Sequence, residues 1–247
     1  MQVLSFTMDM DWAPSQVIEY ALHLFEDYSV KCTLFLTNEV PENIKLNGHE
    51  VAVHPNFKNM NLLEETVSNL LNIVPESIGC RSHALFYAWQ LLPIYAKYGI
   101  CYDSSVVMYN MPSIFPYKLT SSIWELPIFY LDYIHLWINR ETEAAKETSF
   151  KTTSFHLNTD GLKIFDFHPM HIFLNTDTLE RYEAAKPYYH DPDKLREFMN
   201  PESSGTGIRV LLKRILAQAT EQAQSIKTLS EITNLLNHNN TIHIQGI

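Results

Sequence analysis

The sequence predicts an α/β protein, in which a mostly parallel sheet is covered by helices. Short apolar runs alternate with helically spaced patterns over the first hundred residues, as in chains that connect parallel strands through helices. Polar residues follow several of these runs, and ligands bind at the carboxyl ends of parallel strands. With 46% hydrophobic residues and no internal repeat or linker, residues 1–247 are expected to form a single domain.

In the amino-terminal half, the apolar pattern defines the elements in order. Strands are expected at residues 2–8, 32–37, 49–54, 80–82 and 100–105. Helices are expected at residues 15–28, 62–74 and 86–98, because apolar residues recur there with helical spacing.

The carboxy-terminal half is less regular. Residues 106–122 contain two prolines and are expected to form a loop. Two strands are expected next: "IWELPIFYLD", which Pro127 interrupts, and the very apolar "LKIFDFHPMHIFL". Residues 176–204 are expected to form a long excursion with one or two helices, and helices are expected at 206–218 and 228–237. Residues 176–247 would thus form a helical extension.

Composition argues against several partners and locations. The formal net charge of −10 argues against a nucleic-acid partner, and the seven glycines form no nucleotide-binding motif. We find no stretch apolar enough to span a membrane and no signal segment before the first strand. Cys32, Cys80 and Cys101 lie in apolar runs and are expected to be buried thiols in a reducing compartment. We therefore expect a cytoplasmic protein.

Polar side chains gather where the expected strands end. These residues are Asp9, Asp11, His54, Arg81, His83, Asp103, Trp124, Glu125, Asp132, His168 and His171. A single histidine at a strand end is most often a surface or satisfied core residue, and an aspartate there can simply cap the next helix. The shared position of so many polar residues favours a binding site instead.

Asp9 and Asp11 are two residues apart, so their side chains lie on the same side of the first strand. Two carboxylates so close together repel each other unless a cation or a proton lies between them. Carboxylate and imidazole ligands suit zinc or another divalent transition ion, and three protein ligands leave a position open for water. One aspartate is therefore expected to bind the ion and the other to act as a base.

At these positions the chain resembles the polysaccharide deacetylases, the carbohydrate esterase superfamily built on a distorted (β/α) barrel. Five segments carry the resemblance, in the family's order: "SFTMDMDWAP", "GHEVAVHPNF", "RSH", "WELP" and "FDFHP". More narrowly, "DWAP", "HPNF" and "HPMHIFLNT" resemble the deacetylase-like proteins of O-antigen and other surface-polysaccharide gene clusters. The resemblance implies a distorted (β/α) barrel of mostly parallel strands with outer helices.

The resemblance also implies a catalytic base and a metal site. Asp9 would be the general base, oriented by a bidentate pair with Arg81. Asp11 and His54 would bind the metal. The family's second metal-binding histidine would fall at position 58, which is a lysine in this chain. His83, at the neighbouring strand end, is the candidate replacement ligand.

By the same resemblance, His168 would be the general acid, with His171 as its substitute if the chain turns at Pro169. Candidate substrate-binding residues are Trp12, Asn56, Trp124, Glu125 and His171. The implied reaction is hydrolysis of an N-acetyl group on an amino sugar or polysaccharide precursor, with zinc, or else cobalt or nickel, as the cofactor.

Other functions stay open at this stage. The lysine at position 58 is also consistent with a deacetylase relative that binds sugars or acts as a scaffold without catalysis. A metal-dependent hydrolase of another class is a further alternative, and so is a glycosidase that uses Asp9 and Asp11. The excursion over residues 176–204 is long enough to cover the mouth of a barrel, or equally a dimer interface.

Overall fold

A computed structural model describes residues 2–38, 44–140, 150, 151, 155, 157–222 and 224–244. Its central feature is one nine-stranded sheet in the order β6-β7-β5-β4-β3-β2-β1-β9-β8. The strands are β1 (Gln2–Asp11), β2 (Thr33–Leu36), β3 (Glu50–Val53), β4 (Gly79–Cys80), β5 (Tyr102–Asp103), β6 (Tyr117–Lys118), β7 (Trp124–Glu125), β8 (Ile128–Leu131) and β9 (Gly161–Phe167). Every pairing in the sheet is parallel except that between β6 and β7. The predicted α/β class is confirmed.

The sheet curls into a distorted barrel. β7 pairs with β5, whereas β8 pairs with β9 at the other end of the strand order. Only Leu126 and Pro127 separate β7 from β8 in the chain. The residues after β5 run beside this junction, because the Ile128 N–H donates to the Val106 carbonyl (2.8 Å) and Val107 forms a bridge with Ile128. The two ends of the sheet therefore meet along one segment, and the predicted strand interrupted at Pro127 forms this closure.

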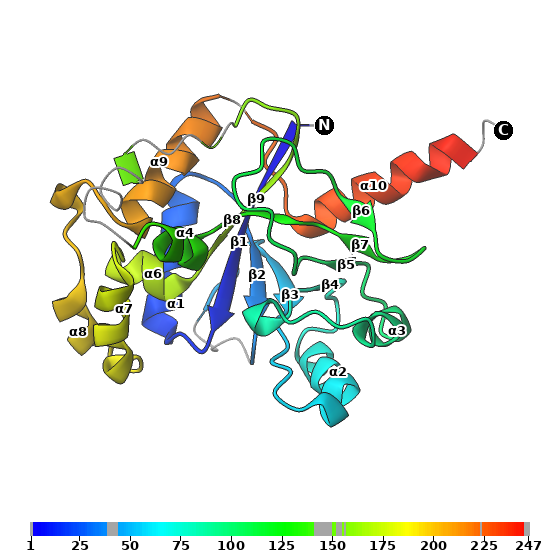
Figure 1. Ribbon diagram of the computed structural model, residues 1–247, viewed down its shortest axis with the longest axis horizontal. Coiled ribbons are helices and arrows are strands. Elements are labelled where there is room, and N and C mark those ends of the chain that lie inside the picture. Colours follow the sequence, from blue (N-terminus) through cyan, green and yellow to red (C-terminus); the bar gives the residue numbers. More distant parts are fainter. Residues whose placement is uncertain are drawn as a thin grey trace.

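The helices are α1 (Ser15–Asp27), α2 (Leu63–Ile73), α3 (Leu91–Lys97), α4 (Asp132–Ile138), α6 (Pro169–Leu174), α7 (Leu179–Ala185), α8 (Pro192–Leu195), α9 (Ile208–Glu221) and α10 (Leu229–Ile244). They lie around the sheet, with α1, α6 and α9 on one side and α2 and α3 on the other (Figure 1). The arrowheads of β1 and β2 mark the carboxyl edge of the sheet, at the bottom of Figure 1.

The main core lies between the central strands and the helices α1, α6 and α9. β1 is buried from Val3 to Met10 because it runs between β2 and β9. Phe6 stacks on Phe165 of β9 with ring centroids 5.6 Å apart and meets Phe25 of α1 edge to face at 6.0 Å. These contacts fix β1 firmly, so the residues at its carboxyl end have a rigid base.

Three predicted elements were wrong in part. The loop expected at residues 106–122 contains the short strand β6. The apolar run over residues 162–174 was expected to be one strand, but β9 ends at Phe167 and the run continues as helix α6. Pro169 suits the first turn of a helix, and all six residues of α6 are buried. A helix buried on every side shows no amphipathic period, which explains the error. The helix expected at residues 86–98 begins only at Leu91.

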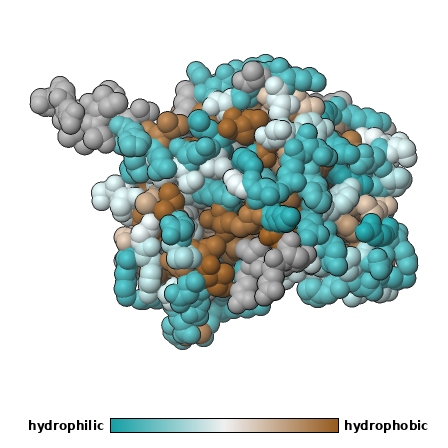
Figure 2. Space-filling view, turned by 180° about the vertical axis from the view of Figure 1, so that it is seen from behind, coloured by the Kyte–Doolittle hydropathy of each residue, from teal (hydrophilic) through white to brown (hydrophobic). Residues whose placement is uncertain are grey.

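Beyond β9, the chain forms the predicted excursion with α7, α8 and short 3-10 turns, followed by α9 and α10. α10 begins against the amino-terminal ends of β2 and β3, where the Leu229 N–H donates to Thr33 Oγ1 (3.0 Å) and the Ser230 N–H to Glu50 Oε2 (3.0 Å). From there α10 extends away from the sheet (Figure 1). Seen from behind, the molecule shows hydrophobic surface framed by hydrophilic residues (Figure 2). No helix among the described residues has the length and apolarity that a membrane span requires.

Candidate active site

A cleft of about 490 Å³ opens at the carboxyl edge of the sheet. Its polar lining includes six of the predicted site residues: Asp9, Asp11, His54, His83, His168 and His171. The side chains of Tyr133, Tyr182 and Lys186 also line it. The volume falls within the usual range for a small-molecule site. The polar residues expected at the strand ends thus converge on one cleft.

A bulge at the end of β1 sets the positions of Asp9 and Asp11. The pairing with β2 shifts register between these two residues, and Asp11 adopts a left-handed conformation with φ +44°. The Thr37 hydroxyl donates a hydrogen bond to the Asp11 carbonyl. Such a backbone is unfavourable for a residue other than glycine and is typical of functional sites. Asp11 does not cap the following helix, whose N-cap is Pro14.

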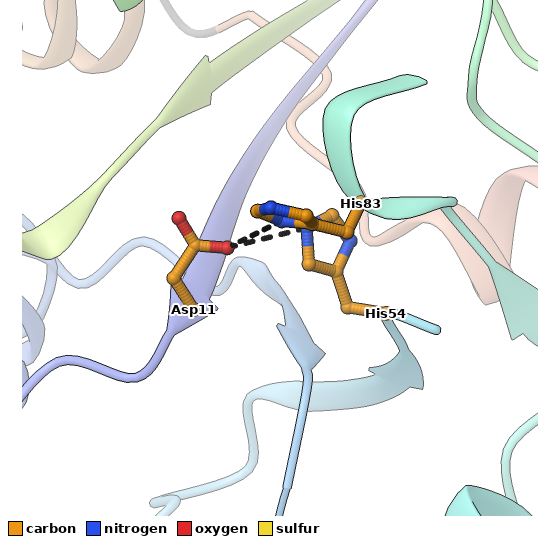
Figure 3. Close-up of side chains that lie close together, drawn as sticks. All are labelled: Asp11, His54 and His83. Atoms are coloured by element: carbon orange, nitrogen blue, oxygen red, sulfur yellow. Dashed lines mark hydrogen bonds and ion pairs between the residues drawn. The ribbon is translucent and has the colours of Figure 1, made fainter. Parts of the chain in front are cut away.

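Asp11 faces two histidines from neighbouring strand ends. His54 Nε2 lies 3.4 Å from Asp11 Oδ1, and His83 Nδ1 lies 3.1 Å from the same oxygen (Figure 3). Burial raises the pKa of Asp11, but the hydrogen bonds from His54 and His83 outweigh burial and hold this pKa far below its ordinary value. Asp11 is therefore a carboxylate at neutral pH.

These three side chains fit a divalent metal ion. One ligand atom from each lies within 4.8 Å of the other two. His54 Nδ1 is 2.7 Å from the Arg81 carbonyl, which can only accept, so Nδ1 carries the proton. In the neutral form of His54, Nε2 then carries a lone pair that a metal ion beside Asp11 would bind in place of the hydrogen bond to Asp11. A backbone hydrogen bond of this kind fixes the tautomer that metal-binding histidines use, and one oxygen with two nitrogens is a donor set that suits zinc.

Lys58, at the position of the family's second histidine, does not line the cleft. Its side chain is exposed, and Nζ lies 5.8 Å from the centre of the Trp12 ring. Trp12 in turn meets the His83 ring edge to face at 5.2 Å. The structure thus puts His83, not Lys58, next to Asp11.

Arg81 is fully buried and holds Asp9, but not as the predicted bidentate pair. Its Nη1 lies 2.8 Å from Asp9 Oδ1 and also contacts Asp166 Oδ1. Its Nε and Nη2 donate instead to the carbonyl and hydroxyl oxygens of Ser104, both within 2.9 Å. The prediction of a bidentate pair with Asp9 was wrong because Asp166, which sequence reasoning missed, shares the guanidinium.

Asp166 lies on β9 two residues before His168, and Thr7 on β1 donates to it at 2.6 Å. Burial raises the pKa of Asp166 well above its ordinary range. Arg81 therefore neutralises mainly Asp9, because Asp166 can hold a proton instead. Strand alternation, which puts Asp166 and His168 on the same side of β9, was the sequence signal for this residue.

His168 is paired with Asp132, to which sequence reasoning assigned no role. His168 Nδ1 lies 2.8 Å from Asp132 Oδ1, and the His168 N–H donates to Asp132 Oδ2 at 2.7 Å. Burial alone would lower the pKa of His168, but the Asp132 carboxylate outweighs burial and raises it well above its ordinary value. His168 Nε2 faces the cleft, 3.9 Å from Asp11 Oδ2. His168 is thus a protonated imidazole whose Nε2 faces Asp11.

His171 lies on buried helix α6 and has a different character. Its Nδ1 is 3.1 Å from Thr176 Oγ1, and its ring packs against Tyr182 at 4.5 Å. Burial lowers the pKa of His171 to about 4. This histidine is neutral at physiological pH, so it fits a hydrogen-bonding role in the cleft better than that of a substitute acid.

The other residues expected to bind substrate are dispersed. Trp12 is 42% exposed beside His83, at the edge of the site. Asn56 lines a separate groove. Trp124 and Glu125 do not line the cleft. The Trp124 indole N–H donates to Asn237 of α10 (2.9 Å), and the buried Glu125 accepts the backbone N–H groups of Ser105 and Val106 at 3.2 and 3.0 Å.

Known proteins resemble this chain over most of its length. The family model for WbmS-like polysaccharide deacetylases matches residues 6–186. A solved structure from Bordetella bronchiseptica, described as a polysaccharide deacetylase involved in O-antigen biosynthesis, is 27% identical; the match covers 87% of this chain and 90% of that chain with a TM-score of 0.75. A CE4-family pseudoenzyme from Bacillus anthracis shares the fold at 12% identity and a TM-score of 0.50, over 94% of this chain and 66% of that one. Among curated proteins there is no match.

Proposed function

The chain belongs to the WbmS-like polysaccharide deacetylase family, and from this premise we propose that it hydrolyses an N-acetyl group on an amino sugar of a surface polysaccharide or its precursor. The observation that carries the proposal is the cluster of Asp11, His54 and His83. On one side of it lies Asp9, which is bound by Arg81, and on the other lies the protonated His168. An O-antigen sugar is the favoured substrate, because the Bordetella bronchiseptica protein is described as acting in O-antigen biosynthesis.

Asp9 is the proposed general base. Arg81 Nη1 holds its Oδ1, while Oδ2 lies 3.7 Å from His54 Nε2 on the side of the metal-binding cluster. A water molecule between Asp9 and the acetamide can therefore transfer a proton to Oδ2 as it attacks the carbonyl carbon. The guanidinium fixes the carboxylate without touching the oxygen that accepts the proton.

Asp11, His54 and His83 are the proposed ligands of a divalent ion, most simply zinc. When bound, such an ion would supply a Lewis acid that stabilises negative charge on the acetamide oxygen. The remaining step belongs to His168, whose Nε2 can donate a proton to the departing amine nitrogen. Asp132 keeps this imidazole protonated and fixes its orientation. The products are acetate and a free amino sugar.

We also propose a cytoplasmic location. All three cysteines are free thiols, and Cys32 and Cys80 are buried, which is the usual state in a reducing compartment.

Two measurements test the proposed function. Protein purified without chelator should contain about one zinc, cobalt or nickel ion per chain, and Asp11→Asn or His54→Ala should lose it. His23→Ala, which changes an exposed histidine on α1, is the matched control and should retain the ion. Asp9→Asn should keep the metal but release acetate from N-acetylated sugars at least about 100-fold more slowly.

The outcomes separate this proposal from a sugar-binding protein without catalysis. Absence of bound metal in the wild-type protein under every purification condition would overturn the metal-dependent mechanism. Metal binding without acetate release from any N-acetylated glycan would favour the binding protein. Unchanged turnover in Asp9→Asn would exclude Asp9 as the base.

A further inference from the structure

One edge of the Arg81 guanidinium is bound by a single residue, Ser104, which directly follows β5. Arg81 Nε donates to the Ser104 carbonyl oxygen (2.8 Å), and Arg81 Nη2 donates to the Ser104 hydroxyl oxygen (2.9 Å). Two hydrogen bonds from a planar group to one residue fix the direction of that group as well as its position. Arg81 Cζ also lies over the Phe35 ring, 4.2 Å from its centre. These contacts hold the guanidinium without using Nη1, the nitrogen that contacts Asp9.

The direction of the guanidinium matters because several acceptors compete for Nη1. This nitrogen lies 2.8 Å from Asp9 Oδ1 and 2.9 Å from Thr7 Oγ1, and it also contacts Asp166 Oδ1. Nη1 carries only two protons, so it cannot bind all three oxygens equally well. A small rotation of the guanidinium toward Asp166 would weaken the bond to Asp9. The two bonds to Ser104 oppose such a rotation.

The Ser104 hydroxyl is itself fixed by the segment that closes the barrel. Its Oγ donates to the Leu126 carbonyl (2.8 Å), and Ser104 is fully buried. Because a hydroxyl has one proton, the oxygen offers a lone pair to Arg81. The Ser104 N–H donates to the Cys80 carbonyl (3.0 Å), and the Leu126 N–H donates to the Asp103 carbonyl (2.8 Å). The hydroxyl therefore has one direction in which it can accept.

We propose that Ser104 is a positioning residue for the hydrolysis: it directs Arg81 Nη1 at Asp9, and thereby keeps Asp9 Oδ2 turned toward the metal-binding cluster. The proposal rests on the proposed function and adds to it a residue that does not line the cleft. Ser104 acts through Arg81 and not on the substrate.

The kinetic test uses Ser104→Ala, which removes the acceptor of Nη2 and leaves the carbonyl that accepts from Nε. The kcat for acetate release should fall about tenfold, because the buried Nη2 loses its partner and the guanidinium is no longer held toward Asp9. KM and the bound metal should not change, because Ser104 does not line the cleft. Ser77→Ala is the matched control. It removes a buried hydroxyl that donates to the Gly79 carbonyl (3.1 Å) and should behave as wild type.

The second readout is an NMR spectrum of protein labelled with ¹⁵N-arginine. Arg81, recognised by its nuclear Overhauser contact with the Phe35 ring, should show separate Nη1 and Nη2 signals because both groups are held. Arg196, whose side chain is 58% exposed, should show one averaged signal. In Ser104→Ala the Arg81 signals should broaden or merge. The buried Arg209, whose Nη1 donates to two backbone carbonyls, should be unchanged and is the internal control.

The two readouts separate failure of this role from failure of the proposed function. An averaged Arg81 signal in the wild type, or Arg81 signals that are the same in Ser104→Ala, would show that Ser104 does not hold the guanidinium, whatever the activity. Changed Arg81 signals with an unchanged kcat would overturn the positioning role alone. Changed Arg81 signals in a protein whose wild type releases no acetate would support the hold of Ser104 on Arg81 and overturn the proposed function.

Discussion

His83 Nδ1 lies 3.1 Å from Asp11 Oδ1, although the two residues are 72 positions apart in the chain. The contact forms because β1 and the turn after β4 end at the same edge of the sheet. His83 begins a 3-10 turn in which Ala84 and Leu85 both have positive φ, and two such residues in succession are unfavourable outside glycine. This strained turn directs the imidazole to Asp11, so the chain forms a three-residue cluster without a histidine at position 58.

We predict that a histidine at position 58 cannot replace His83. His83→Ala should lower zinc or cobalt affinity on the order of 100-fold, because even residues that only support a ligand contribute 10- to 100-fold. The double variant His83→Ala/Lys58→His should stay as weak, since Lys58 is exposed and does not line the cleft. Isothermal titration calorimetry measures both affinities.

Lys58→His alone is the control for folding and should bind metal like the wild type. Recovery of affinity in the double variant to within a few fold of the wild type would show that position 58 does reach the metal.

A second prediction concerns the buried charges around Arg81. Arg81→Met should lower the free energy of unfolding by about 3–5 kcal/mol, because it leaves the buried Asp9 carboxylate without its cation. Asp166→Asn should cost only about 1 kcal/mol, because burial raises the pKa of Asp166 and the asparagine resembles its protonated form. Urea unfolding monitored by circular dichroism gives both values.

The two variants carry different information. A loss below about 1 kcal/mol in Arg81→Met would mean that Asp9 is not held as a buried ion. A loss in Asp166→Asn as large as that in Arg81→Met would mean that Asp166 is an ionised partner of Arg81.

The sequence was sufficient for the parts of the site that depend on local pattern and strand direction. For β1, β3 and β4, the end of the strand could be read from the apolar run, and parallel strands bring their carboxyl ends to one edge. Asp9, Asp11, His54, His83 and His168 were therefore expected together, and the structure places them together. Contacts between side chains far apart in the chain could not be predicted, because they produce no pattern in the local sequence. Asp166 is 85 positions from Arg81, and Asp132 is 36 positions from His168.

Trp124 and Glu125 lie at a strand end, as expected, but not at the cleft. They form β7, which β5 separates from β4 in the sheet. The Trp124 indole N–H donates to Asn237 of α10, and the buried Glu125 accepts the N–H groups of Ser105 and Val106. An apolar run indicates where a strand ends, but the place of that strand in the sheet depends on pairing between residues far apart in the chain.

A third prediction tests the pair formed by Asp132 and His168. Asp132→Asn removes the negative charge that holds the pKa of His168 above its ordinary value, so this pKa should fall by at least about one unit. Acetate release at neutral pH should fall about 100-fold, because less of the imidazole is protonated and its orientation is less fixed. An NMR titration of the imidazole and a steady-state assay measure the two effects.

Tyr133→Phe is the matched control. It removes a hydroxyl from the cleft one residue away and leaves the contact between Asp132 and His168 intact, so the pKa of His168 should not change. An unchanged pKa in Asp132→Asn would exclude Asp132 as the group that keeps His168 protonated.

The last prediction concerns the pH dependence of stability and uses His135, which lies on α4 outside the cleft. His135 is buried, and its Nδ1 is 2.8 Å from the Tyr109 hydroxyl oxygen. Burial lowers the pKa of His135 to about 4, whereas an unfolded chain has a value of about 6.5. Between these two values the unfolded state binds a proton that the folded state does not, so His135 destabilises the fold as pH falls from 6.5 to 4. Each unit of difference corresponds to about 1.4 kcal/mol, which gives roughly 3 kcal/mol in all. Buried carboxyls with raised pKa values, such as Asp103 at about 6, act in the opposite direction over part of this range.

The measurement is therefore a difference between the wild type and His135→Gln, each unfolded in urea at pH 7, 5.5 and 4. The variant should gain stability relative to the wild type as pH falls, while His23→Gln, at an exposed position, should show no such trend. Parallel curves for the wild type and His135→Gln would mean that His135 takes up its proton in the folded protein as readily as in the unfolded chain.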